Sequence, residues 1–160
     1  MIRYALLFGL LLACIAGAAA NAASSSNAPS IARGKYLVRF GACNDCHTPG
    51  WRETFGKVPV SKWLIGSNIG FRGAWGTIYP ANVRQRFTQI TENQWLAMVR
   101  TREGPEPMIW HDLRALSLDD QRSIYRFVRS LGSAGPPTLQ DVPPDIEPKT
   151  PYITTVQPTK

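Results

Sequence analysis

Cys43-Asn44-Asp45-Cys46-His47 is the stretch that decides how this chain folds and what it can bind. Two thiols three positions apart can add to the two vinyl groups of one haem, and the residue after the second thiol places an imidazole against the iron. The spacing therefore predicts one covalently attached haem c, bonded through Cys43 and Cys46, with His47 as an axial ligand of the iron.

Three other interpretations of this stretch are weaker. A thioredoxin-like dithiol follows a strand and opens a long helix, whereas here a helix is expected before Cys43, and Pro49 and Gly50 come soon after the motif. A zinc site needs four ligands, and beyond the motif the chain after residue 22 offers only His111 as a further thiol or imidazole. A structural disulfide would leave His47 without a purpose.

The first 22 residues resemble an export signal. Arg3 precedes an unbroken apolar stretch of 17 residues from Tyr4 to Ala20, and small residues then lead to a cleavage site after Ala22. An uncleaved anchor is the competing interpretation, because a stretch of this length can just span a thinned bilayer. We expect residues 1–22 to be a signal peptide, residues 23–29 a spacer, and the mature protein to be periplasmic, where haem is attached to such motifs.

Hydrophobic periodicity predicts three helices in one domain that spans residues 30–135. Ser30 caps the first, at residues 31–40, and Gly34 inside it indicates that another backbone approaches closely. The apolar residues of this helix are expected on one face: Ala32, Tyr36, Leu37 and Phe40. Capping boxes predict the other two helices at residues 91–100 and 117–131.

The segments between and after these helices lack a sustained period. Residues 41–90 are rich in Gly, Pro, Trp and Tyr, which predicts a long loop packed on something apolar. A flat haem needs apolar walls, and such a loop can supply them. Residues 136–160 form a proline-rich tail that we expect to be extended, and either draped over the domain or mobile.

The second axial ligand has few candidates. Met108 follows Pro107 in a loop and comes close before Trp110, where a thioether can be held rigidly, so we favour it as the iron ligand. Met98 lies at core spacing in a predicted helix, which favours a packing role. His111 and an open sixth position remain alternatives.

A family resemblance is carried by five stretches of the chain: the motif KYLVRFGACNDCHTPG, the segments LIGSNIGF, GTIYPAN and PMIW, and the final helix SLDDQRSIYRFVRSLG. Through these stretches, residues 30–132 resemble class I c-type cytochromes. More narrowly, they resemble the single-haem domains related to cytochrome c subunits of bacterial periplasmic dehydrogenases. The resemblance implies an all-α fold in which the N- and C-terminal helices cross beside the haem, with His47 proximal and Met108 distal. Haem packing or propionate contacts are expected from residues of the aromatic loop: Trp75, Tyr79, Asn82, Arg72 and Arg84.

Charge and chemistry narrow the function. The chain carries a formal net charge of +7, and residues 31–90 hold nine basic side chains against two acidic ones. In an exported protein without a dense basic run, this balance favours redox partners with an acidic docking surface over nucleic acid.

No nucleophile, paired carboxylate or phosphate loop accompanies the motif, so we expect an electron carrier between a dehydrogenase and a respiratory acceptor, not an enzyme by itself. The alternatives are an obligate haem subunit of a dehydrogenase complex and an open-site gas binder or peroxidase. Membrane contact is expected only through an uncleaved signal or a partner complex.

Overall fold

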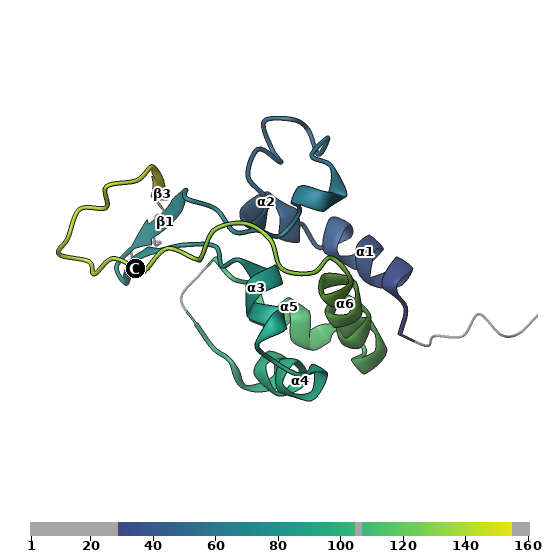
Figure 1. Ribbon diagram of the computed structural model, residues 1–160. Coiled ribbons are helices and arrows are strands. Elements are labelled where there is room, and N and C mark those ends of the chain that lie inside the picture. Colours follow the sequence, from purple (N-terminus) through teal and green to yellow (C-terminus); the bar gives the residue numbers. More distant parts are fainter. Residues whose placement is uncertain (1–28, 105–106, 155–160) are drawn as a thin grey trace, which may run out of the picture.

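The computed structural model describes residues 29–104 and 107–154. The expected signal peptide, all of the spacer but Pro29, and the end of the tail lie outside these described residues. Two helices from opposite ends of the domain, α1 (Ile31–Phe40) and α6 (Leu118–Ser130), pack side by side (Figure 1). A Cβ atom added at Gly34 would lie 1.9 Å from the Ser123 carbonyl oxygen of α6, so only glycine allows this approach.

The remaining elements lie between and beyond these two helices. In chain order they are α2 (Cys43–His47), the 3₁₀ turn η1 (Val60–Lys62), β1 (Gly70–Gly73), β2 (Gly76–Ile78), α3 (Val83–Thr88), α4 (Glu92–Thr101), α5 (Trp110–Ala115) and, after α6, β3 (Tyr152–Thr154).

The predicted helices at residues 31–40 and 91–100 are confirmed to within a residue, because their caps are local. Ser30 accepts a hydrogen bond from the Arg33 amide, and Thr91 and Gln94 form a complete capping box. Ser117 caps α6 in the same way, but Asp120 forms an ion pair with Arg33 of α1 instead of closing a box.

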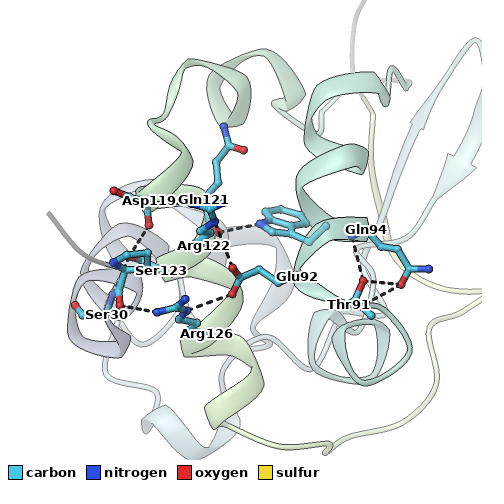
Figure 2. Close-up of polar contacts among 11 residues, drawn as sticks. Ser30, Thr91, Glu92, Gln94, Asp119, Gln121, Arg122, Ser123 and Arg126 are labelled. Atoms are coloured by element: carbon cyan, nitrogen blue, oxygen red, sulfur yellow. Dashed lines mark hydrogen bonds and ion pairs between the residues drawn. The ribbon is translucent and has the colours of Figure 1, made fainter.

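Polar contacts tie α6 to α1 and to α4. Glu92 at the start of α4 pairs with Arg122 and Arg126 of α6 (Figure 2). On the other side, the Ser30 amide donates to Ser123 Oγ over 3.1 Å. The start of α1 and the start of α4 are therefore both held by α6.

The expected all-α class is wrong, because the described residues also form a three-stranded sheet in the order β2-β1-β3. β1 and β2 make a two-residue hairpin with Phe71 opposite Ile78, and β3 adds to β1 in parallel with Phe71 opposite Ile153. The strands are short, and β1 begins and ends with glycine, which is poor in strand propensity. The third strand of the sheet therefore comes from the pairing of β3 with β1, two segments that lie far apart in the chain.

The tail is bound along its length as far as residue 154. Val142 and Thr77 exchange backbone hydrogen bonds of 2.7 and 2.8 Å, and Tyr79 Oη lies 2.6 Å from Thr150 Oγ1. A Cβ atom at Gly76 would lie 2.2 Å from the Val142 carbonyl oxygen, so this glycine lets the tail pass. The tail is therefore draped over the β1–β2 hairpin as far as residue 154.

The hydrophobic core lies between the helices and the 51–64 segment. Its most deeply buried members are Val38, Trp63, Leu64, Val99 and Val128. The predicted inward face of α1 is partly wrong: Gly34, Leu37 and Val38 are buried, whereas Tyr36 and Phe40 are 53% and 77% exposed. The glycine contact decides which side of α1 faces α6.

Within the described part of the chain, no helix combines the length and the apolar character needed to cross a bilayer.

Candidate haem-binding site

The motif CNDCH forms a short helix of its own. Ala42, with φ of 55°, separates α1 from α2 and redirects the chain. Cys43, Cys46 and His47 then occupy the first, fourth and fifth positions of α2, and such spacings place side chains on one side of a helix. Local helical structure thus brings both thiols and the imidazole to one surface.

Buried hydrogen bonds hold α2 against the following segment. Thr48 Oγ1 donates to Asn44 Oδ1 over 2.7 Å and accepts from the Leu64 amide over 2.8 Å. The Gly66 amide donates to the His47 carbonyl oxygen over 3.0 Å. Since Asn44 and Thr48 are both buried, this network fixes the orientation of α2.

The His47 ring is oriented by a backbone carbonyl. Its Nδ1 lies 2.8 Å from the Ala81 carbonyl oxygen, which can only accept, so Nδ1 carries the proton. Desolvation by burial lowers the pKa of His47, and the Ala81 hydrogen bond opposes that shift only in part. The imidazole is therefore neutral at neutral pH, with the lone pair of Nε2 available to a metal.

The two thiols are unbonded and protonated. Cys43 and Cys46 are both free and half-buried. Desolvation by burial raises the pKa of Cys43 to about 11 and also raises the pKa of Cys46. At neutral pH both side chains are therefore thiols and not thiolates.

Trp75 has a polar atom that the protein leaves without a partner. Its indole lies against Gly73, where a Cβ atom would come within 2.6 Å of the ring. Trp75 Nε1 is one of three buried side-chain polar atoms without a hydrogen bond in the described residues, the others being Asn44 Nδ2 and Gln121 Oε1. A buried donor of this kind suits an anionic oxygen such as a haem propionate.

The other polar loop residues considered as haem contacts bind the chain itself. Asn82 Nδ2 donates to the Ala134 and Pro136 carbonyls, both over 2.8 Å, and Asn82 Oδ1 caps α3. Tyr79 is buried and bonded to Thr150. These two residues anchor the tail.

Both arginines of this group also bind backbone carbonyls. Arg84 is 6% exposed and donates to the Leu131, Gly132 and Ser61 carbonyls, which caps the end of α6. Burial lowers its pKa. Arg72 donates to the Pro144 and Ile146 carbonyls and so binds the tail.

The candidates for the second axial ligand lie in different surroundings. Met108 and Met98 are both half-buried and pack against the core, and Met98 Sδ also lies 3.9 Å from Arg102 Nη1. His111 lies on α5 with its side chain 74% exposed, 3.5 Å from the Asp112 carboxylate. Burial thus favours a methionine thioether over His111 as the second axial ligand. Between the two methionines, Met108 remains the choice on the sequence argument given above.

The sequence did not predict two features that lie beside the CNDCH motif. The Ala81 carbonyl carries no side-chain signal, since any residue would supply it. Ile153, from the tail, lines a cavity of about 90 Å³ beside Cys46 together with Ile69 and Phe71. Ile153 stands between Tyr152 and Thr154, and all three residue types favour strands, which is the one feature of the sequence that could have indicated β3.

Two negative findings complete the description. Across residues 29–104 and 107–154, no three His, Cys, Asp or Glu side chains gather into a site for a metal ion. No protein-family model, curated protein or solved structure matches the chain.

Proposed function

We propose that this chain is an exported c-type cytochrome with one haem, which carries single electrons between a periplasmic dehydrogenase and a respiratory acceptor. The observation that supports it most is the hydrogen bond from His47 Nδ1 to the Ala81 carbonyl, made by the histidine of the CNDCH helix. Metal-bound histidines characteristically donate their second ring N–H to a carbonyl or carboxylate. The imidazole is thus already in the tautomer that an axial ligand needs.

The residues present fit a haem in three further respects. The thiols of Cys43 and Cys46 are free, and each can add its S–H across a vinyl group to form a thioether without any oxidant. Trp75 Nε1 is a buried donor without a partner. Phe71 and Ile153, apolar side chains of the sheet, line a small cavity with Cys46, whose lining also includes the charged residues Asp45, Arg52 and Glu53.

Each of these residues has a separate task in electron transfer. When bound, the haem supplies a reversible change between ferrous and ferric iron. His47 would donate its Nε2 lone pair to the iron, and the hydrogen bond to the Ala81 carbonyl holds its ring in place. Met108 is proposed to complete the coordination, which would leave no open position for a substrate and makes this a carrier and not an enzyme by itself.

Covalent attachment is the direct test. Acid-acetone extraction of the wild-type protein, produced with a haem-attachment apparatus, should leave the haem on the polypeptide. Cys43→Ala with Cys46→Ala should abolish retention, whereas Cys14→Ala, which removes the chain's third cysteine, should not. Haem that extracts freely from the wild-type protein would overturn the proposal.

An obligate dehydrogenase subunit held through the proline-rich tail is the second candidate, and the contacts of the tail favour the free carrier. From Ala134 to Thr154 the tail is bound repeatedly to its own domain, including the β3 pairing with β1. A segment engaged in this way has fewer groups to offer a partner subunit.

A further inference from the structure

Two large aromatic side chains on α1 lie in solvent. Tyr36 and Phe40 are 53% and 77% exposed, and their rings stack with centroids 5.7 Å apart at an interplanar angle of 12°. Their position follows from the Gly34 contact, which turns the opposite side of α1 toward α6. The two rings therefore form one continuous aromatic surface exposed to solvent.

A third exposed ring comes from the neighbouring turn. Phe55 is 88% exposed and precedes Gly56, where a Cβ atom would lie 3.7 Å from Arg39 Nη2. The Arg39 guanidinium also lies 5.5 Å from the centroid of the buried Trp51 ring. The end of α1 and the 51–56 turn thus meet at Arg39, and we call Tyr36, Phe40 and Phe55 the aromatic face.

The segments 31–40 and 51–62, which carry the aromatic face, are basic. Lys35, Arg39, Lys57 and Lys62 are exposed, and no carboxylate within the described residues pairs with them. Arg33 and Arg52 each pair with one acid, Asp120 and Asp45. Glu53 is an exposed acid in the same turn as Phe55, so the exposed rings lie on segments with an excess of positive charge that one acid reduces.

We infer that the aromatic face is a docking surface for an acidic protein, which binds through carboxylates around an apolar centre. Aromatic residues and arginine are enriched at protein–protein contacts, and complementary charge accelerates encounter. A second copy of this chain is disfavoured, because it would bring like charges together. Phe40 is three residues before Cys43, so the docked protein would lie near the haem attachment point; that the partner is a redox protein rests on the function proposed above.

Electron transfer from a reduced acidic flavodoxin provides the test, with the haem-loaded protein followed by stopped-flow absorbance. Lys35→Glu with Lys57→Glu should slow bimolecular reduction roughly tenfold or more, since steering by charge is worth about 10 to 1000-fold. Tyr36→Ser with Phe40→Ser should slow it at unchanged net charge. The matched controls are Arg86→Glu with Arg100→Glu, which makes the same change in net charge, and Leu139→Ser with Ile146→Ser, which removes two exposed apolar side chains elsewhere; both should react like wild type.

The possible results separate the explanations. Dithionite should reduce all variants to the same extent, which shows that the haem is intact; a protein without haem would instead show no absorbance change with either reductant and would refute the proposed function. Normal dithionite reduction with equal flavodoxin rates in all variants would overturn the docking proposal. A third result is that the aromatic variants lose the ability to sediment with phosphatidylglycerol vesicles while their rates with flavodoxin stay unchanged. That result would identify the aromatic face as a lipid contact and would also overturn the docking proposal.

Discussion

Replacing Gly34 with alanine should separate α1 from α6. The added Cβ atom would lie 1.9 Å from the Ser123 carbonyl oxygen and 2.7 Å from Phe127 Cβ. Ordinary contact requires about 3.4 Å, so α6 must retreat by more than 1 Å or α1 must tilt. The obstacle is a backbone carbonyl in a helix, which cannot rotate away.

The size of the effect follows from two opposing terms. Overpacking a core costs about 1–3 kcal/mol, and a backbone clash belongs at the upper end of that range. Alanine is better than glycine in a helix by about 1 kcal/mol. The expected net loss in the free energy of unfolding is about 2 kcal/mol, which lowers Tm by roughly 8 °C at about 4 °C per kcal/mol.

Urea denaturation followed by tryptophan fluorescence measures this loss, because Trp63 packs edge-on against Phe127 with ring centroids 6.1 Å apart. Gly104→Ala is the control: its Cβ atom would meet only the Trp110 ring, at 3.5 Å from Nε1 and 3.9 Å from Cδ1, which are ordinary contacts. That variant should stay within about 0.5 kcal/mol of wild type. A Gly34→Ala protein as stable as wild type, or more stable, would refute the close approach of α1 and α6.

Two further outcomes are expected. Arg33 holds the pKa of Asp120 below its usual value by hydrogen bonding, so this pair stabilises the fold at neutral pH and its contribution is lost as pH falls below about 4. Asp120→Asn should thus cost less than about 1 kcal/mol at pH 7 in urea titrations, and nothing once the wild-type carboxylate is protonated; a deficit that persists in acid would contradict the ion-pair explanation. Met108→Ala should abolish the thioether–iron charge-transfer band and admit carbon monoxide, whereas Met98→Ala should keep the band and cost about 1–2 kcal/mol, less than a fully buried methionine. Loss of the band in the Met98 variant alone would reverse the assignment.

The all-α expectation failed at segments that pair over long distances. β1 and β3 are separated by roughly eighty positions in sequence, and each is too short and too irregular to be recognised by alternation. Their pairing depends on the tail crossing Gly76 and on Arg72 binding the Pro144 and Ile146 carbonyls. The pairing of β3 with β1 depends on these long-range contacts, so sequence patterns could not have predicted it, whereas the β1–β2 hairpin is local and was missed because its strands are short and rich in glycine.

The sequence by itself determined what is encoded over a few residues. The CNDCH spacing specifies two thiols and one imidazole within five residues, and the caps at Ser30 and Thr91 set where helices begin, because both depend on neighbouring atoms alone. The expected loop over residues 41–90 was wrong in part, because it contains the short helices α2 and α3 as well as β1 and β2. Gly34 even predicted a close backbone contact, although not which residue makes it.

Only the tertiary structure decided the rest. It chose Ala81 as the carbonyl that orients His47, and it bound Tyr79, Asn82, Arg72 and Arg84 to the chain's own backbone and tail. It also turned Tyr36 and Phe40 outward, since the side of α1 with the smallest residue is the side that can approach α6 most closely. These outcomes depend on how distant segments meet, and a hydrophobic period indicates that a helix face is buried without indicating which segment covers it.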